Sequence, residues 1–391
     1  MRVIVNTMAT YRQRTGVGSY IANLMAEMPK VAGTDEIAVF PEGWMAGVAS
    51  VAGSFLRSTQ AQHILPKSIA EAPQPRRFQW RGFLKQFGRG LCRRGFQLTS
   101  SRGQFDLYHE PNFIPWPSSL PVVLTVHDLS VLLHPEWHPV DRVRNHEQHF
   151  VRCVNECRHV ITVSETIRQE TIRYFGLPEE RVTAVHNGVR SDMRPMYVSE
   201  IAPTLERYSL PSRYVLFVGS VEPRKNLLTL MRAYCGLPEA VRRECPLILA
   251  GPWGWNYQKE QAYYQHVGQA RGVRHLGYVG DEELPALYNG ARVLAYPSHY
   301  EGFGLPPVEM LSCGGCVIAS TAPALREVLG NHAVLISPLD EDGWRDALHK
   351  AITDDDYHAQ LRQGGSAFAG RYSWARCAEH TWQVYRKAAS L

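Results

Sequence analysis

The sequence predicts an α/β protein of two doubly wound, Rossmann-like domains that face a central cleft. Short apolar runs of strand character alternate with helical segments along the chain, which is typical of parallel sheets covered by helices. The 391 residues, 45% hydrophobic and 20% charged, are enough for two globular cores. The alternation restarts near residue 214, after a segment rich in Gly, Pro and polar residues, which favours a second domain there.

The first domain is expected to span residues 1–195. A helix beginning at Ser19 should follow its first strand, and another should end at Phe175. Its predicted strands lie at 3–5, 122–126, 160–163 and 182–185.

The second domain is expected at 196–374, and the Gly, Pro and polar residues of 187–211 suit a linker that can act as a hinge. In doubly wound sheets, ligands bind beyond the carboxyl ends of the strands, so two facing domains would form a deep cleft. The predicted strands lie at 214–218, 247–250, 293–296, 317–319 and 334–336.

Composition limits the class of protein. No run approaches eighteen consecutive apolar residues, and residues 1–6 are too short for a signal peptide, so a cytoplasmic protein is expected. The eight cysteines show no regular spacing and are expected to be reduced thiols. Cys313 and Cys316 have metal-like spacing but lack the second pair that a zinc site needs.

Residues 299–310 hold the most informative pattern, in which seven residues separate Glu301 from Glu309 across a glycine-rich turn that enters a helix. Pro306 and Pro307 suit the first turn of that helix. Backbone N–H groups of the turn, together with the helix N-terminus, would favour a diphosphate. The two carboxylates would then face sugar or ribose hydroxyls, or the positive charge of a reacting sugar. The turn residues expected to bind the nucleotide sugar are Gly302, Phe303, Gly304 and Leu305.

This pattern resembles the signature of retaining GT-B glycosyltransferases of family 4, and the resemblance covers nearly the whole chain. In this order and spacing the matching segments are jointly specific. They lie at 16–18, 126–128, 163–165, 186–189, 217–219, 222–226, 276–279 and 372–374.

The resemblance implies that residues 1–195 handle the acceptor, that 196–374 bind the nucleotide sugar, and that the last helix, 375–391, packs back on the first domain. It also implies that Arg224 and Lys225 hold the leaving diphosphate. Each such charged donor contributes on the order of a hundredfold in rate. Many relatives have an arginine directly after the preceding glycine. Ser220 stands there in this chain, so Arg224 is expected to supply that charge.

By the same resemblance, Glu309 contacts two ribose hydroxyls and Glu301 lies near the donor sugar. Glu301 would stabilise the oxocarbenium-like state or, alternatively, act as a nucleophile in a double displacement. His127, at the end of a predicted strand, would contact the donor sugar or pack as a core histidine. Asp128, its neighbour, would cap a turn or accompany it.

Gly16 and Gly18 are expected in a loop beside the cleft, near the donor, or in an ordinary strand-to-helix turn. The acidic runs 340–342 and 354–356 precede helices and are expected to cap them. No metal ligands and no cofactor are therefore assigned, and a metal-independent reaction is expected.

Residues 76–102 carry eight basic and no acidic residues, with aromatic residues between them. Phe83, Phe87 and Leu91 repeat every four positions, as in an amphipathic helix. Such a helix would contact an anionic membrane or pack on its own domain with solvated arginines. A nucleic-acid partner is not expected, because the chain has no recognition motif and a net charge of only +5.

The function hypothesis is transfer of a hexose, with mannose from GDP-mannose as first choice, to a lipid-linked oligosaccharide acceptor on a polyprenyl diphosphate. The enzyme would act in bacterial surface polysaccharide synthesis, at the inner face of the cytoplasmic membrane. The alternatives are a UDP-sugar with a soluble acceptor, a dinucleotide oxidoreductase and a catalytically silent sugar-binding partner. The sequence lacks the third glycine of the dinucleotide-binding fingerprint, because Ile21 stands at that position. This argues against an oxidoreductase.

Overall fold

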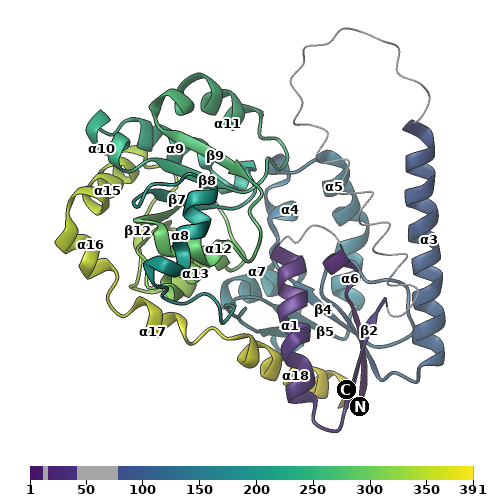
Figure 1. Cartoon of the computed structure of the whole chain (residues 1–391). Helices are drawn as coiled ribbons and strands as arrows, with labels where there is room; N and C mark the ends of the chain where they lie inside the picture. The colour runs from purple at the N-terminus through teal and green to yellow at the C-terminus, as the bar shows by residue number, and fades with distance from the viewer. Residues whose placement is uncertain (12–15, 42–77, 391) are drawn as a thin grey trace.

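The computed structural model describes residues 1–11, 16–41 and 78–390, with side chains left out for 78–89. Within these residues the strands form two six-stranded parallel sheets, one in each of two lobes that lie side by side (Figure 1). The predicted fold class of two doubly wound domains is therefore confirmed.

The N-terminal lobe is built on the sheet β2-β1-β3-β4-β5-β6, whose central strands are buried on both faces. Apolar runs form these strands because helices cover both faces of a parallel sheet. The strands are β1 (Arg2–Asn6), β2 (Glu36–Phe40), β3 (Leu107–Glu110), β4 (Val122–Val126), β5 (His159–Thr162) and β6 (Val182–Ala184). The helices are α1 (Gly16–Ala32), α3 (Phe78–Arg102), α4 (Ser130–Leu133), α5 (Val140–Asn145), α6 (Val151–Glu156) and α7 (Glu165–Phe175).

The C-terminal lobe has the sheet order β12-β11-β10-β7-β8-β9, in which the order reverses between β7 and β10. The strands are β7 (Val215–Val218), β8 (Leu247–Ala250), β9 (Val273–Gly277), β10 (Val293–Tyr296), β11 (Val317–Ser320) and β12 (Val334–Ile336). The helices are α8 (Val198–Arg207), α9 (Leu227–Cys235), α10 (Glu239–Glu244), α11 (Gln258–Tyr263), α12 (Leu284–Gly290), α13 (Leu305–Ser312), α14 (Pro323–Leu329), α15 (Glu341–Thr353), α16 (Asp355–Leu361) and α17 (Gly365–Ala369).

Every strand predicted from an apolar run is confirmed, but β2, β3 and β9 were missed. These strands carry polar or charged residues that hide the apolar pattern. In β3, His109 and Glu110 are buried yet hydrogen-bonded, His109 to Thr125 at 2.8 Å and Glu110 to Asn6 at 2.7 Å. Satisfied polar groups can occupy a sheet interior, so polarity alone does not exclude a strand.

The prediction of a loop at residues 16–18 was wrong, because α1 begins at Gly16. The segment predicted as a linker contains α8 despite Pro203, and its role as a hinge stays a prediction. In α8, Glu200 accepts a hydrogen bond from the backbone of Tyr197 at 2.8 Å, and the helix packs on α12. This end contact and packing support a helix where composition suggested none.

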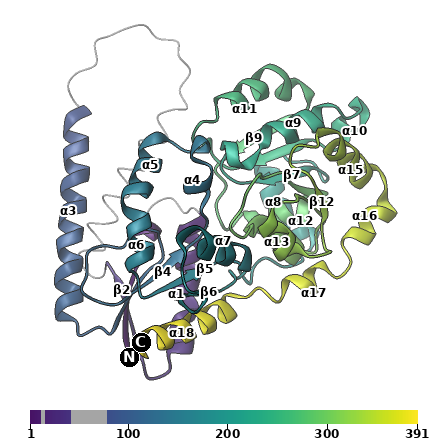
Figure 2. The same cartoon turned by 180° about the vertical axis from the view of Figure 1, so that it is seen from behind.

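The chain crosses between the lobes twice, and the two crossings lie together. After β6, Val189 donates a backbone hydrogen bond to Tyr372 at 2.9 Å. A side chain at Gly188 would overlap the backbone of Trp374, so glycine permits this approach. The last helix, α18 (Trp374–Ser390), then runs back along α1 of the N-terminal lobe (Figure 2). Its Tyr385 hydroxyl lies 2.6 Å from Nδ1 of buried His109.

The long helix α3 stands at the outer side of the N-terminal lobe (Figure 1). Near its end, Cys92 and Phe96 are buried, and Phe96 packs with Phe40 and Tyr108. Arg93, Arg94 and Arg102 are exposed. One face of this part of α3 thus packs on its own domain while its arginines are solvated. Arg76 and Arg77 lie outside the described residues, and no side chain is described for residues 78–89, which include Phe83 and Phe87.

Candidate active site

The candidate site forms where the strand order of the second sheet reverses. The loops after β7 and β10 leave the carboxyl ends of neighbouring strands at this point, which is where ligands bind in doubly wound sheets. The first loop carries Ser220, Arg224 and Lys225, and the second carries Glu301. A backbone hydrogen bond of 2.8 Å from His299 to the carbonyl of Arg224 joins the two loops. The topology therefore brings together residues that are 76 apart in sequence.

Glu301 lies at the centre of a buried cluster of charges. Its Oε1 accepts from Lys225 Nζ at 2.6 Å, and its Oε2 accepts from Arg224 Nη1 at 2.8 Å. Lys225 also donates to the Tyr296 hydroxyl at 2.6 Å, and Arg224 to Glu222 at 2.9 Å. The side chains of Lys225 and Glu301 are 11% and 7% exposed. Glu301, Lys225 and Arg224 are thus each held in one geometry by at least two contacts.

The charged state of the cluster follows from mutual pairing. Burial alone would raise the pKa of Glu301, but Arg224 and Lys225 outweigh it and lower that pKa to about 2. Burial opposes the charge of Arg224 too, yet Glu301 and Glu222 raise its pKa well above the ordinary value. The pKa of Lys225 is lowered, chiefly by burial. Glu301 is therefore an ionised carboxylate at neutral pH, unsuited to donating a proton.

Glu309 lies on α13, where it accepts a hydrogen bond of 2.7 Å from the Tyr288 hydroxyl. Burial raises its pKa although Tyr288 favours the ionised form. The two glutamates of the sequence pattern therefore have opposite environments. Glu301 is neutralised by cations, whereas Glu309 accepts a hydrogen bond from a neutral hydroxyl.

The turn between the glutamates is tightly packed against both lobes. Gly302 is buried, and a side chain there would overlap the carbonyl oxygen of His127. Its own carbonyl accepts from the Ser164 hydroxyl at 2.7 Å. Gly304 has a φ of 89°, a conformation that glycine adopts without strain, and it precedes α13. Phe303 is buried with its ring 5.4 Å from that of Tyr372, so its side chain serves packing.

The helix α13 begins at Leu305, with a proline in its first turn, as predicted from Pro306 and Pro307. Ser220 follows Gly219, where an added Cβ would lie 3.8 Å from Cε of Lys225. Lys225 thus runs alongside the end of β7. Gly219 has a φ of 149°, which residues with a side chain rarely adopt, and this gives a physical reason for glycine at this position.

His127 lies at the carboxyl end of β4 and is half-buried. Its Nε2 lies 2.8 Å from the carbonyl of Pro111, and its ring meets Tyr20 edge-on at 4.8 Å. Burial lowers its pKa although Pro111 and Asp128 oppose this, so the ring is neutral at pH 7. Asp128 accepts from the backbone and the hydroxyl of Ser130 at 2.9 and 2.6 Å, and thereby caps a turn.

Gly16 and Gly18 occupy the first turn of α1 instead of a loop. Gly16 is exposed, and a side chain at Gly18 would lie 3.2 Å from the carbonyl oxygen of Ala9. Within the described residues, no hydrogen bond links either glycine to the charge cluster. Their predicted role beside the donor stays a prediction.

The late acidic runs cap helices, as predicted. Asp340 accepts from the backbone of Gly343 at 2.9 Å, and Asp354 from that of Tyr357 at 2.8 Å. Asp355 pairs with Arg292 at 2.5 Å. All eight cysteines are free thiols.

No role was predicted for Tyr296, Tyr288 or Glu222, which hold Lys225, Glu309 and Arg224 in place. Tyr296 is the last residue of β10, and Glu222 directly precedes the Pro-Arg-Lys segment. A polar residue ending an otherwise apolar strand would have been a signal for Tyr296. Tyr288 carries no such signal, because only packing of α12 on α13 brings it to Glu309.

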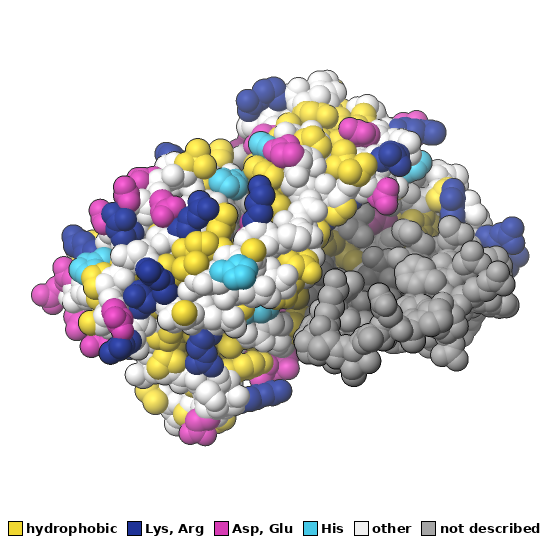
Figure 3. Space-filling model, turned by 90° about the horizontal axis from the view of Figure 1, so that it is seen from above, with side chains coloured by type: hydrophobic (Ala, Val, Ile, Leu, Met, Phe, Trp, Pro, Cys, Tyr) yellow, Lys and Arg dark blue, Asp and Glu magenta, His cyan; other side chains and the backbone are white. Residues whose placement is uncertain are grey.

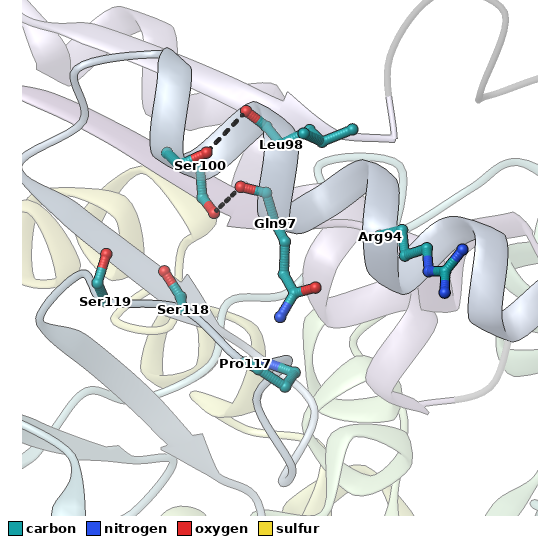
Figure 4. A pocket seen from close by; sticks show the side chains of 8 residues that line it. Arg94, Gln97, Leu98, Ser100, Pro117, Ser118 and Ser119 are labelled. Carbon is teal, nitrogen blue, oxygen red and sulfur yellow. Dashed lines mark hydrogen bonds between the residues drawn. The ribbon is translucent and has the colours of Figure 1, made fainter.

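A separate groove lies between α3 and the chain before β4 (Figure 4). Its lining is mostly small and polar. It includes Arg94 and Gln97 on α3 and Pro117 to Ser119 before β4. Because this chain leads into the amino end of β4, the groove lies at the opposite end of the sheet from His127 and is not part of the charge cluster.

Comparison with known proteins agrees with this two-lobed fold. Residues 14–192 match "Glycosyltransferase Family 4", and residues 207–368 match "Glycosyl transferases group 1". The O-antigen chain mannosyltransferase B of Escherichia coli is 38% identical over 284 residues, which are 72% of this chain and 74% of that protein. The serotype-specific mannosyltransferase WbdA of Escherichia coli is 30% identical over 68% of this chain, which spans 33% of that protein.

Among solved structures, Anabaena Alr3699/HepE in complex with UDP-glucose superposes over 100% of both chains with a TM-score of 0.70 and 18% identity. At that identity the likeness concerns the fold, which is GT-B. The chain belongs to glycosyltransferase family 4, and it is a glycosyltransferase. No helix in the described residues is long and apolar enough to cross a bilayer.

Proposed function

We propose that this enzyme transfers mannose from GDP-mannose to a lipid-linked oligosaccharide, with retention of anomeric configuration, in the synthesis of an O-antigen-type polysaccharide. The observation that carries the transfer reaction is the buried cluster of Lys225, Arg224 and Glu301 at the switch point. The names of the relatives support the choice of mannose and of an O-antigen acceptor.

In the proposed reaction, the bond from the anomeric carbon to the diphosphate breaks, and negative charge develops on the phosphate. Lys225 and Arg224 would stabilise this charge, and the N-terminus of α13 adds a favourable field. We expect no divalent metal to be required, because Lys225 and Arg224 are placed to donate directly to the departing diphosphate. The departing phosphate would then accept the proton of the attacking acceptor hydroxyl.

Positive charge develops on the sugar ring at the same time. Glu301 is ionised and rigidly held, so it would stabilise that charge or bind a sugar hydroxyl. Both of its oxygens already accept from cations at 2.6 and 2.8 Å, which favours this role over that of a nucleophile. Glu309 would accept from the ribose hydroxyls, and neutral His127 would contact the donor sugar.

A donor panel tests this proposal. The purified enzyme is incubated with GDP-mannose, UDP-glucose and ADP-glucose and a panel of octyl glycosides, with and without EDTA, and the product linkage is read by NMR. We expect GDP-mannose to give the fastest transfer, an α-linked product and no effect of EDTA. Transfer from a UDP-sugar alone would support the alternative donor. Nucleotide binding without transfer to any acceptor would indicate a silent binding partner, and an inverted anomer would contradict retention.

A further inference from the structure

A second group of polar side chains lies between the lobes beside the charge cluster, and its hydrogen-bonding capacity is unused. His138 follows the short 3-10 helix Pro135–Trp137 of the N-terminal lobe and is only 5% exposed. Neither of its ring nitrogens has a hydrogen-bond partner among the described residues. A buried imidazole without partners costs folding free energy, so its retention calls for an explanation.

Arg142, on α5, faces the same region. Its guanidinium lies 4.7 Å from the ring of Trp255, which comes from the loop after β8 in the C-terminal lobe. Within the described residues this guanidinium makes no hydrogen bond or ion pair, so its five N–H donors are available. Trp255 is also 5.9 Å from the His138 ring, and it donates to the carbonyl of Trp137 at 2.9 Å. This tryptophan therefore holds both groups at the boundary between the lobes.

Glu222, in the loop after β7 of the C-terminal lobe, belongs to the same group because its charge acts on Arg142. It is 3% exposed, and its Oε1 is bound to Arg224 at 2.9 Å, while its Oε2 has no partner among the described residues. Arg224 binds Glu301 with its other nitrogen. Glu222 and Glu301 are thus separated by a single guanidinium. A ligand group bound at Glu222 Oε2 would therefore lie next to the proposed site of sugar transfer.

The charges around this region are balanced. The charges of Asp128 and Glu222 raise the pKa of Arg142, whereas that of Arg224 lowers it. For His138, the charges of Arg142 and Arg224 lower the pKa and that of Asp128 raises it. Burial lowers the pKa of His138 to about 4, and the positive charge of Arg142 is the next largest cause. The ring is therefore neutral at pH 7. Two carboxylates facing two guanidinium groups leave no excess positive charge for another phosphate. A neutral imidazole offers one donor and one acceptor, which matches a hydroxyl group.

We propose that His138, Arg142 and Glu222 form the binding subsite for the terminal pyranose of the acceptor glycan and orient its attacking hydroxyl toward the donor. Arg142 donates to ring or hydroxyl oxygens, His138 pairs with one hydroxyl, and Glu222 Oε2 accepts from another. This assignment rests on the proposed transfer reaction and names the class of acceptor that it uses, a polyhydroxylated sugar ring.

The test compares Arg142→Ala and His138→Phe with wild-type enzyme, using the octyl glycoside that the wild type accepts best. Arg144→Ala on the same helix and His149→Phe are matched controls, since both side chains are exposed. We expect each test variant to raise the acceptor KM at least tenfold, while the donor KM and the hydrolysis of donor without acceptor stay within twofold. Intact hydrolysis also shows that the variant folds. Arg142→Lys replaces Arg142→Ala if the latter does not fold, because lysine keeps the charge and loses the planar fork.

The outcomes separate the two proposals. An unchanged acceptor KM, or a donor KM that rises as much as the acceptor KM, would overturn the acceptor subsite and leave the transfer reaction standing. A wild-type enzyme that uses no sugar nucleotide with any glycoside would overturn both.

Discussion

At the scale of single residues, the site depends on how carboxylates are paired. Glu301 contacts two cations and stays ionised, Glu309 is bound to a tyrosine hydroxyl, and Glu222 has one oxygen in use. A buried charge without its partner is strongly destabilised, by about 3–5 kcal/mol. Substitutions here therefore alter both chemistry and stability, and a test must measure both.

We expect Lys225→Ala and Glu301→Gln each to reduce transfer at least about a hundredfold, the scale of one lost charged contact in the transition state. Initial rates with GDP-mannose measure this effect, and circular dichroism checks the fold. Lys259→Ala and Glu244→Gln, at exposed positions of the same lobe, should retain wild-type rates. A folded Lys225→Ala or Glu301→Gln enzyme with nearly normal rates would contradict the proposed roles.

At the scale of secondary-structure elements, α3 differs from the other helices in its position and charge. It stands at the edge of the N-terminal lobe, with Arg93 and Arg94 exposed beside Leu98, which is 54% exposed. On the C-terminal lobe, by contrast, Figure 3 shows basic and acidic side chains interspersed. We propose that α3 gives the enzyme peripheral contact with an anionic membrane, where a lipid-linked acceptor would be found.

The expected result is that the enzyme sediments with phosphatidylglycerol vesicles and not with phosphatidylcholine vesicles. Arg93→Glu with Arg94→Glu should weaken this binding at least about tenfold, since each cation near the surface contributes roughly 1 kcal/mol. Arg243→Glu with Arg376→Glu, exposed but distant from α3, is the matched control. Equal weakening by both pairs would indicate an effect of net charge alone and would rule out α3 as the contact.

At the scale of the whole molecule, Glu327 connects the lobes. It lies on α14 of the C-terminal lobe and accepts from the backbone of Glu165 and Thr166 at the start of α7, at 2.8 and 2.7 Å. It also accepts from the Thr166 hydroxyl at 2.6 Å and from His186 at 2.7 Å. Burial would raise its pKa, but His186 and Thr166 lower it to about 2. An ionised carboxylate at a helix N-terminus thus binds one lobe to the other.

We expect Glu327→Gln to lower stability by about 1–3 kcal/mol at pH 7, because one amide oxygen cannot replace two carboxylate oxygens. The folded pKa is below the ordinary 4.5, so the carboxylate contributes its stability above pH 4.5 and loses it as the pH falls toward 2. The difference in Tm between wild type and variant should therefore shrink between pH 5 and pH 3 in scanning calorimetry. Glu379→Gln, at an exposed position on α18, should show no difference at any pH. A Tm difference independent of pH would show that the Glu327 charge does not hold the lobes together.

The sequence determined the order of the apolar strands and the positions of the polar motifs directly after them, because buried parallel strands require apolar runs and leave polar residues at their carboxyl ends. It therefore predicted two sheets and put Lys225 and Glu301 among the candidate residues. Only the tertiary structure decided which groups pair. Tyr288 with Glu309, Glu327 with α7, and His138 beside Arg142 and Trp255 are all set by packing between elements far apart in the chain. Such contacts leave no periodic pattern in sequence, since they depend on where two surfaces meet.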